Sequence, residues 1–519
     1  DPRVDPIMNR RHLLALLGTR LLSGARPSWT WDRRGAQFQL PDGSLEIQWI
    51  SPSSFALIRR WPDSAPSPRL PYRQVEFTAF EEGQSVELQT RYLRVQVDKK
   101  SFLLTVRDDE GKLLLRETAP ARRSRDRVTL QFALQKDEQI YGLGPRSEPD
   151  LNARGRRLTT RHPLLISTAG YGMYHLHRGE FDFDLTARHV VSIPDADKVE
   201  YAFYFGPYPK SVLEEHALVR PPEFDGMPDF GIRRPGELPR EAFLLPGPPK
   251  ATWDSLNETV RTLIHASFSG IHAPAFDLSA FELAGPALLD RARQLAAVMP
   301  FVVASRAHES VAAMRSRLAP YFATYLQEAH DLGLPMIHPL PLQFATDPQT
   351  TRRLDAFLLG DELLVAPLLT AAERRSVYLP MGIWTDLHTN QEHRGRRTVE
   401  VASPPQGPPL LARNGSIVPF SRSDGSIELH YFPNLGAEFF LFETEVGESS
   451  QFHAAPAGDY MRLEIESKVS RTYEWIIHHR GPARELRGPG KWHYDADRNN
   501  LHVVMDGPVG EDRIVNLRL

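Results

Sequence analysis

Three carboxyl side chains lie close together in one short, proline-rich stretch of the sequence. Glu223, Asp225 and Asp229 stand within "PPEFDGMPDFG". Two carboxyl groups placed on opposite sides of a bond can serve as acid, base or nucleophile, which is the chemistry of hydrolysis. Proline and glycine without periodicity, however, are typical of a solvated loop. We therefore interpret these three residues as loop residues rather than as a catalytic pair.

Two pairs of histidines are the other residues whose type could do chemistry. His478 and His479 are adjacent, and His388 and His393 lie five positions apart. Neither pair has a carboxylate at the spacing that metal ligands usually show, and the chain has no cysteine. The sequence therefore predicts no structural metal and no cofactor.

The overall composition excludes several classes of protein. The 519 residues are 41% hydrophobic and 24% charged, which predicts a folded chain of several domains. The 62 basic and 65 acidic residues are intermixed and give a net charge of -3, so no basic stripe for nucleic acid is present. No stretch of about 18 apolar residues occurs, which excludes a membrane-spanning helix.

The N-terminus contains a short apolar run, "MNRRHLLALLG" (8–18), which looks like a weak signal peptide. Arg20 ends the run and no clean small-residue cleavage site follows, so we expect ordinary structure there. The absence of cysteine leaves the redox compartment open, and we expect a cytoplasmic protein.

The pattern of apolar and polar residues changes three times along the chain and predicts a β plus α/β multidomain fold. Alternating runs such as "RYLRVQVD" predict an N-terminal β-sandwich, and residues 221–249 read as a linker or irregular loop. Three helical patterns follow at 253–268, 286–299 and 311–333, with short apolar strands such as "LPMIHPL" and "ELLVAPL". Alternation then returns to the C-terminus. We expect an N-terminal β-sandwich, an α/β domain and two C-terminal β-sandwich domains, with the division 1–220, 221–369, 370–430 and 431–519.

Several segments resemble glycoside hydrolase family 31, the α-glucosidase and α-xylosidase family. "DEQIYGLGPR" and "YAFYFGPYPKSVLEEH" resemble its N-terminal β-domain. "YFATYLQEAHDLGLPMIHPLPLQFATDP", "FLLGDELLVAPLL", "RSVYLPMGIWTDLHTNQEHRG" and "PLLARNGSIVPF" follow in the order of its last barrel helices and first C-terminal β-domain. The resemblance implies retaining hydrolysis of α-glycosides on a (β/α)8 barrel, by two carboxyl groups about 5 Å apart.

The position of the family's proton donor is occupied by proline here. The family carries its acid/base aspartate in a Gly-Asp-Asn element before Ala-Thr-Trp, and "PGPPKATW" aligns with it from Gly247 to Trp253. Pro248 then stands on the aspartate and Pro249 on the asparagine. Because proline has no titratable proton, the acid/base is lost at this position.

The nucleophile segment and about half of the barrel are also missing. The family's Asp-Met-Asn-Glu element does not occur in this chain. The roughly 145 residues from Pro221 to Ala366 are too few for an eight-fold barrel, which needs about 250. We therefore expect a truncated or partial (β/α)8-type barrel.

Part of the family's sugar pocket can still be aligned. "SGIHAPAFDLSAF" places Asp277 and Phe281 on positions that, by resemblance, contact the sugar in the innermost subsite. His308 is a weaker match to the family's histidine, because gapless alignment puts Ser305 there. From the residues alone, Asp277 is equally well a helix N-cap, and Phe281 is favoured as a core residue.

These observations leave three readings of the function. We expect a non-catalytic, family-31-like pseudoenzyme that binds carbohydrate or acts as a scaffold. The alternatives are an active retaining α-glycosidase with relocated carboxylates, and a deletion product without function beyond folding. Any α-linked saccharide should bind weakly at the remnant barrel. A homo-oligomer or a partner protein is expected to cover the exposed edges of that barrel.

Overall fold

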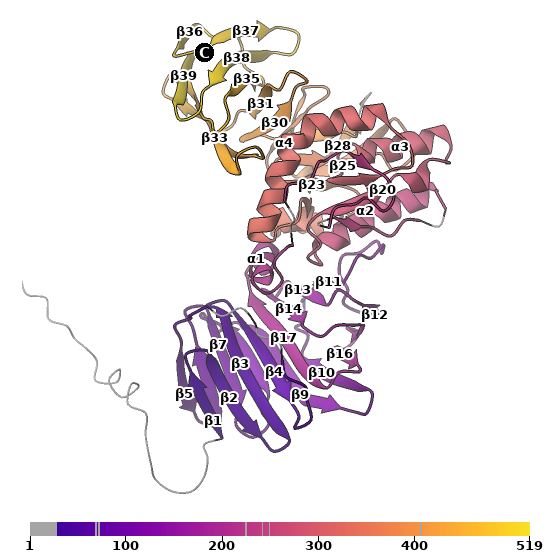
Figure 1. Ribbon diagram of the computed structural model, residues 1–519, viewed down its shortest axis with the longest axis vertical. Coiled ribbons are helices and arrows are strands. Elements are labelled where there is room, and N and C mark those ends of the chain that lie inside the picture. Colours follow the sequence, from indigo (N-terminus) through magenta and orange to yellow (C-terminus); the bar gives the residue numbers. More distant parts are fainter. Residues whose placement is uncertain are drawn as a thin grey trace, which may run out of the picture.

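A computed structural model describes residues 28–519, except 68, 69, 71, 72, 224, 225, 241, 249, 405 and 406. The N-terminal apolar run, Asp225 and Pro249 therefore lie outside the described residues. Figure 1 shows an elongated molecule with a large β-domain at one end, helices packed around short strands in the middle, and a smaller β-domain at the C-terminal end.

Two large sheets form the N-terminal β-domain. The first has eight strands in the order β1(Trp29–Asp32), β2(Gly35–Leu40), β3(Gly43–Ser51), β4(Ser54–Arg60), β17(Lys198–Phe205), β14(Tyr171–His175), β13(Leu164–Ser167) and β11(Ile140–Gly142). The second has nine, in the order β12(Arg157–Thr160), β15(Phe181–Asp184), β16(His189–Pro194), β10(Arg127–Phe132), β9(Leu113–Arg123), β8(Leu104–Asp108), β7(Leu93–Asp98), β6(Ser85–Gln89) and β5(Thr78–Glu82).

The alternation of the sequence explains how these sheets pack. In β7, Leu93, Val95 and Val97 are fully buried while the residues between them are partly exposed. Their side chains join one hydrophobic core with Ile47 and Phe203 of the first sheet. Because neighbouring strands are mostly joined by hairpins, this core is built from local pairings. The expected N-terminal sandwich is consistent with this arrangement.

Helix α1(Pro209–Val219) leaves the sandwich and packs against β17 and β14. Gly172 of β14 makes this close contact possible, because a Cβ atom there would lie 2.2 Å from Cγ1 of Val212. Val212 and Leu213 join Tyr204 in a second core, which continues into the middle of the molecule. Helix α1 therefore couples the N-terminal β-domain to the helical layer.

The middle layer is built on a small sheet whose pairings are all parallel. Its order is β18(Ile232–Arg233), β21(Phe301–Val303), β20(Pro274–Asp277) and β19(Phe243–Leu244). The three helical patterns of the sequence appear as α2(Trp253–Ser267), α3(Pro286–Ala296) and α4(Glu309–Leu332). A short 3-10 helix, η1(Ser279–Phe281), follows β20. Helix α2 begins with a capping box in which Thr252 and Ser255 bond reciprocally.

The segment interpreted as a linker supplies both edges of this sheet. Strands β18 and β19 are two residues long and come from the proline-rich stretch, whereas β20 and β21 occupy the centre. Interpreting residues 221–249 wholly as an irregular loop was therefore wrong. Strands this short are not long enough to show alternation, so no periodic signal marks them.

Two apolar strands expected in the α/β domain belong to an antiparallel sheet instead. "LPMIHPL" and "ELLVAPL" contain β22(Ile337–Pro339) and β24(Leu363–Val365). They lie in a six-stranded sheet completed by β23(Phe357–Leu359), β29(Leu410–Arg413), β26(Ile383–Asp386) and β27(Glu392–Arg394). This sheet crosses the expected boundary between 369 and 370. Strands β25(Arg374–Leu379) and β28(Arg397–Ala402) pair beside it, and α5(Leu340–Gln343) and η2(Thr350–Arg352) lie between β22 and β23.

Two five-stranded sheets form the C-terminal end. One has the order β30(Ser416–Ser421), β31(Ile427–Phe432), β35(Arg471–Ile477), β38(Asn500–Gly507) and β37(Lys491–Asp495). The other has β32(Ala437–Glu443), β33(Glu448–Ala457), β34(Tyr460–Glu466), β39(Asp512–Arg518) and β36(Glu485–Arg487). The expected boundary between 430 and 431 falls inside β31. We propose a division after β29 in its place.

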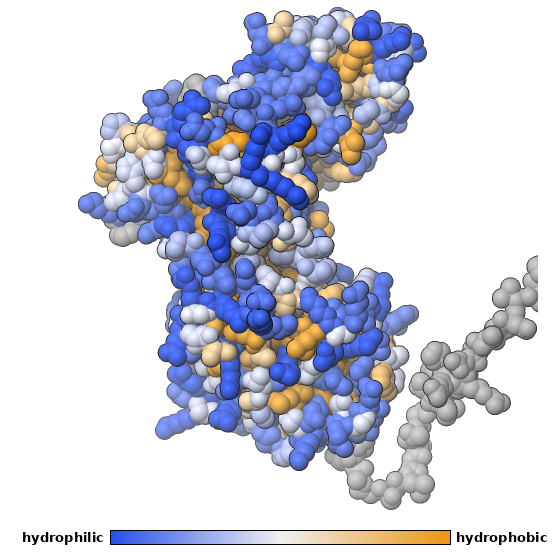
Figure 2. Space-filling view, turned by 180° about the vertical axis from the view of Figure 1, so that it is seen from behind, coloured by the Kyte–Doolittle hydropathy of each residue, from blue (hydrophilic) through white to orange (hydrophobic). Residues whose placement is uncertain are grey.

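The described part of the chain has no helix that is long and apolar enough to cross a membrane. Figure 2 shows one face of the molecule, on which hydrophilic residues predominate and apolar residues are exposed in separate patches, several of them over the N-terminal β-domain.

Candidate functional site

Asp277 stands at the carboxyl end of β20, the end at which parallel α/β sheets place their ligands. Its Oδ1 accepts hydrogen bonds from the backbone N of Ser279 at 3.0 Å and from Oγ of Ser279 at 2.5 Å. These bonds close the turn that leads into η1. The carboxylate thus closes a turn just before η1, whose N-cap residue is Leu278 and has no side-chain capping bond, so Asp277 is not the helix N-cap.

Gly247 of the proline-rich segment lies beside this carboxylate. A Cβ atom added to Gly247 would lie 3.4 Å from Oδ2 of Asp277. Pro248 follows Gly247 and offers neither a side-chain donor nor an acidic group. The residue next to the one aligned with the family's acid/base thus lies close to the residue aligned with the sugar contact.

Phe281 lies in the core of the α/β layer. Its side chain is 0% exposed, and its ring lies 5.8 Å from the ring of Phe276 in a stacked geometry. Its backbone N donates to the carbonyl of Leu278 at 2.9 Å. A fully buried ring presents no face to a sugar, and this geometry favours core packing.

His308 is held by an ion-pair network that the sequence did not reveal. Its Nδ1 accepts from Nε of Arg293 at 3.2 Å, and its Nε2 lies 3.0 Å from Oε1 of Glu282. An accepting Nδ1 leaves the proton on Nε2, which donates it to Glu282. Glu282 also accepts from the backbone N of Ser305 at 3.1 Å. The network joins the end of η1, helix α3 and the start of α4.

Together these contacts describe what the strand ends of the α/β layer can do. The two carboxylates nearest to them in sequence, Asp277 and Glu282, are both used in local hydrogen bonds. Retaining hydrolysis needs one carboxyl group as proton donor and a second as nucleophile. The residues singled out from the sequence lie along one edge of the α/β layer. The hydrogen bonds of Asp277 and Glu282 do not bring these two carboxyl groups together as such a pair.

The other sequence candidates have structural surroundings as well. Glu223 lies 3.4 Å from Nη2 of Arg240, with both side chains exposed, and Asp229 accepts from the backbone N of Gly231 at 3.0 Å. These are contacts of a solvated loop. His478 is buried and is hydrogen-bonded to His430 at 3.0 Å and to Asn390 at 2.7 Å. Burial holds the pKa of His478 well below its usual value.

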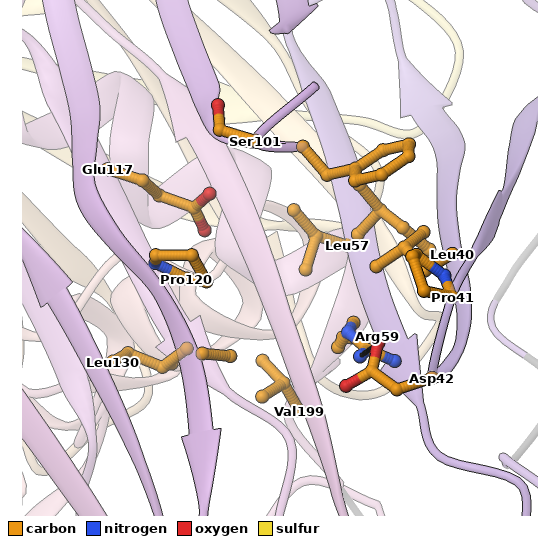
Figure 3. Close-up of a pocket in the computed structure, with 13 residues that line it drawn as sticks. Leu40, Pro41, Asp42, Leu57, Arg59, Ser101, Glu117, Pro120, Leu130 and Val199 are labelled. Carbon is orange, nitrogen blue, oxygen red and sulfur yellow. Dashed lines mark hydrogen bonds and ion pairs between the residues drawn. The ribbon is translucent and has the colours of Figure 1, made fainter. Parts of the chain in front are cut away.

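A small cavity lies between the two sheets of the N-terminal β-domain (Figure 3). Its volume of about 120 Å³ is below the roughly 300–1,000 Å³ of typical ligand pockets. Glu117 lines it and accepts from the backbone N of Leu104 at 2.9 Å, and burial raises the pKa of Glu117 to about 7. Figure 3 places Glu117 across the cavity from Arg59 and Asp42. Nη2 of Arg59 lies 2.6 Å from Oδ1 of Asp42.

A larger cavity of about 380 Å³ lies between α4 and the two C-terminal β-regions. We call it the interdomain cavity. Met314 and Arg317 of α4 form one wall. The other walls are formed by residues of the six-stranded sheet region and by polar residues of β31, of β38 and of the position after β35. The lining includes Leu410, Phe420, His388, His430, His478, Asn500 and His502. Apolar walls with a few converging polar groups are typical of small-molecule sites.

Two family models match the chain and flank the α/β layer. A model of the glycosyl hydrolase 31 N-terminal galactose mutarotase-like domain matches residues 38–162, and one of the glycosyl hydrolase family 31 C-terminal domain matches residues 333–418. Pro248, Asp277 and Phe281 lie between the two matches.

Curated relatives include α-glucosidases. Neutral alpha-glucosidase AB of Mus musculus is 29% identical over 219 residues, which cover 36% of this chain and 23% of the relative. Alpha-glucosidase 2 of Bacillus thermoamyloliquefaciens is 24% identical over 283 residues, which cover 49% of this chain and 36% of the relative. The chain thus spans about a quarter to a little over a third of the length of these relatives.

Solved structures share the fold at low sequence identity. A dextranase of this family from Flavobacterium johnsoniae, complexed with isomaltotriose, has a TM-score of 0.79 at 15% identity, covering 95% of this chain and 99% of that one. The cycloalternan-forming enzyme of Listeria monocytogenes, in complex with a pentasaccharide substrate, has a TM-score of 0.80 at 12% identity, covering 95% and 76%.

Taken together, the β-domains, the parallel strands between them and these likenesses define a multidomain protein of the glycoside-hydrolase type. The chain belongs to glycoside hydrolase family 31.

Proposed function

We propose that this chain is a non-catalytic member of glycoside hydrolase family 31 with a carbohydrate-binding or scaffolding role. The observation that carries the proposal is the "PGPP" segment beside Asp277, because it puts Pro248 at the aligned position of the acid/base. Without an ionisable side chain at that position, the leaving group has no proton donor.

The topology of the small parallel sheet supports the same proposal. Strand β18 precedes β21 in the chain by a long stretch, yet the two pair in parallel, as the first and last strands of a closed barrel do. We take β18 as a first barrel strand and β19, β20 and β21 as the last three. Only residues 234–242 connect β18 to β19. The strands expected between them, among them the one that would carry the nucleophile, have no room in nine residues.

Turnover of aryl glycosides tests the loss of catalysis. We expect no release of the aryl group from an aryl α-glucoside or an aryl α-xyloside above the heat-inactivated blank, with an active family member as positive control. Turnover that disappears in Asp277→Asn would overturn the proposal and favour an α-glycosidase with relocated carboxylates. Turnover that survives in Asp277→Asn would overturn it too, with a site elsewhere.

We place saccharide binding on the β-domains, in the interdomain cavity. The remnant strand ends offer a capped carboxylate and a buried ring, whereas the cavity has the volume for a monosaccharide unit and has polar groups on several walls. Structural neighbours bind glucose and isomaltotriose. Calorimetric titration with maltose should show binding that His388→Ala weakens, because His388 is an exposed residue of the lining. An unchanged affinity in His388→Ala would contradict this placement.

We also propose that the α/β layer takes part in assembly as a homo-oligomer. Its two edge strands come from the proline-rich segment and are only two residues long, and Leu244 of β19 and Leu283 after η1 are 45% and 100% exposed. Exposed apolar residues beside short sheet edges are surfaces that a second chain covers. Light scattering should give the mass of an oligomer, and Leu283→Glu should lower it. A monomeric parent chain would contradict the proposal.

A further inference from the structure

Three residues with metal-binding side chains meet on one face of the C-terminal sheet that contains β35, β38 and β37. His493 of β37 stands opposite His502 of β38 in the strand register. His502 stands opposite Ile476 of β35, and Glu474 lies two residues before Ile476. Because side chains alternate between the faces of a sheet, His493, His502 and Glu474 all point to the same side. We call them the His-His-Glu cluster.

The donor atoms of this cluster are already close together. Nδ1 of His502 is hydrogen-bonded to Oε1 of Glu474 at 2.7 Å, and the rings of His493 and His502 stack with their centroids 4.4 Å apart. One ligand atom from each of the three residues lies within 4.8 Å of the others. Ligands bound to one tetrahedral ion at about 2.0–2.2 Å stand roughly 3.3 Å apart. Because an ion lies near the plane of each imidazole that binds it, the stacked rings of His493 and His502 must rotate out of their nearly parallel planes to reach that geometry.

One nitrogen of the cluster is uncommitted. Nε2 of His502 is buried and has no hydrogen-bond partner among the described residues. Burying a polar atom without a partner costs free energy, so such an atom in a native fold calls for an explanation. The contact with Glu474 uses Nδ1, the other nitrogen of the ring. Nε2 and Glu474 can therefore bind the same ion only after the His502 ring turns about its Cβ–Cγ bond, and that ion would satisfy Nε2.

The surroundings orient the carboxylate. Glu474 is 6% exposed, and its two oxygens contact His502 and Arg422. Nη1 of Arg422 contacts Oε2 of Glu474, and its Nε donates to Glu428 at 2.8 Å. Arg422 fixes one oxygen of Glu474 as an outer partner does in metal sites. Its positive charge opposes a cation, and therefore points to moderate affinity.

We propose that Glu474, His493 and His502 bind one divalent transition-metal ion of the zinc class. Two imidazoles and one carboxylate are the donor set of open zinc sites, whereas calcium and magnesium prefer oxygen ligands throughout. His493 is exposed on an edge strand, so the remaining coordination position opens to solvent. This site does not rest on the proposed function. The sequence prediction of no metal considered only neighbouring histidines, and these ligands come from three strands.

Cobalt and zinc titrations test the proposal on the full chain. Co²⁺ should produce visible absorption bands at one equivalent, and Zn²⁺ should compete with a chromophoric chelator. His493→Ala should weaken both by about tenfold or more, since loss of a ligand costs at least as much as loss of an outer-shell partner. Glu474→Gln should do the same. His388→Ala is the matched control, because His388 lines the neighbouring cavity but is not in the cluster.

The two sets of variants separate this site from the saccharide site. His493 does not line the interdomain cavity, so His493→Ala should leave maltose binding unchanged, while His388→Ala should leave metal binding unchanged. His493 is an exposed edge residue, and circular dichroism should show a folded variant. Absence of saturable Co²⁺ and Zn²⁺ binding by the parent chain would overturn the proposal. Equal binding by the parent and His493→Ala would overturn it as well.

Discussion

The N-terminal β-domain and the α/β layer of this chain differ in the number and the length of their strands. The β-domain carries eight- and nine-stranded sheets around one continuous core, and a family-31 model matches most of it. The α/β layer has four strands of two to four residues. Both regions belong to the same family architecture, but only the N-terminal β-domain has strands of ordinary length.

This difference comes from how each region closes its sheet. Antiparallel strands are joined by local hairpins, so the sandwich depends little on the rest of the chain. A barrel closes only when its first strand meets its last, and each strand between them needs a crossover helix. In this chain the central strands β20 and β21 have β19 and β18 of the proline-rich segment as their outer neighbours. If the two regions are independent, a change in one should leave the stability of the other as it is.

Arg315 is the side chain whose removal we expect to cost the most. It is 1% exposed, and its guanidinium donates to the carbonyls of Phe230 at 2.9 Å, Pro300 at 2.8 Å and Ala296 at 3.3 Å. It thereby ties the proline-rich segment and the loop before β21 to α4. Arg315→Ala should lower the free energy of unfolding of the α/β layer by about 3–5 kcal/mol, because several buried carbonyls lose a charged donor at once. Urea titration followed by circular dichroism measures it.

The control for Arg315 is an arginine whose ion pair is exposed. Arg374 lies 3.6 Å from Glu400, and both side chains are about two-thirds exposed. Arg374→Ala should change the free energy by less than about 1 kcal/mol. If Arg315→Ala also lowered the stability of the N-terminal β-domain by the same amount, the two regions would unfold as one unit and the comparison would fail.

Glu117 should make the stability of the N-terminal β-domain depend on pH. Burial raises the pKa of the Glu117 carboxyl from 4.5 to about 7 in the folded domain. Between pH 4.5 and pH 7 the folded domain therefore keeps a proton that the unfolded chain releases. The stabilisation by Glu117 is therefore full below pH 4.5 and is lost as the pH rises through 7, by about 2–3 kcal/mol. Glu117→Gln should remove this dependence. Calorimetric melting of the domain at pH 5 and pH 7.5 measures it.

A second carboxyl of the same domain serves as the control for Glu117. Glu110 is exposed in the turn between β8 and β9, so Glu110→Gln should leave the pH dependence as it is in the parent chain. A parent-like dependence in Glu117→Gln would show that other groups are responsible.

The sequence predicted most elements whose signal is local. Helices α2, α3 and α4 appear where their apolar spacing placed them, whereas the N-cap of η1 is Leu278 and not Asp277. What failed was the choice of partners, because β22 and β24 have apolar sequences that suit a parallel or an antiparallel neighbour equally. The Glu282–His308 contact spans 26 positions, and no local pattern marks it.

Thr252 offers a smaller test at the place where the "PGPP" segment ends. Its Oγ1 accepts from the backbone N of Ser255 at 3.0 Å, and Oγ of Ser255 accepts from the backbone N of Thr252 at 2.8 Å. Thr252→Ala should cost about 1 kcal/mol of the stability of the α/β layer. Thr262→Ala, in the middle of the same helix, should cost none, because alanine is the better helix former. Equal losses in the two variants would mean that the cap does not set where α2 begins.

The smallest effect is expected where the family would place its sugar contact. Each charged hydrogen bond from Asp277 to a sugar hydroxyl could contribute about 1.5–3 kcal/mol. After the costs of association, one such residue supports only millimolar binding. Its Oδ1 is moreover occupied by Ser279. Asp277→Ala should therefore change maltose and xylose binding by less than about twofold in calorimetric titration.

The outcome for Asp277 bears on the whole comparison between the two regions. If the parent chain bound maltose at micromolar concentration and Asp277→Ala abolished it, the old pocket would be complete, and the loss of strands from the α/β layer would have been inferred wrongly. If Asp277→Ala left binding intact and His388→Ala weakened it, the saccharide would be bound where the β-domains meet. Saccharide binding would then be retained without catalysis. The reason would be that the β-sheets form by local strand pairings, whereas a barrel needs its first strand to meet its last.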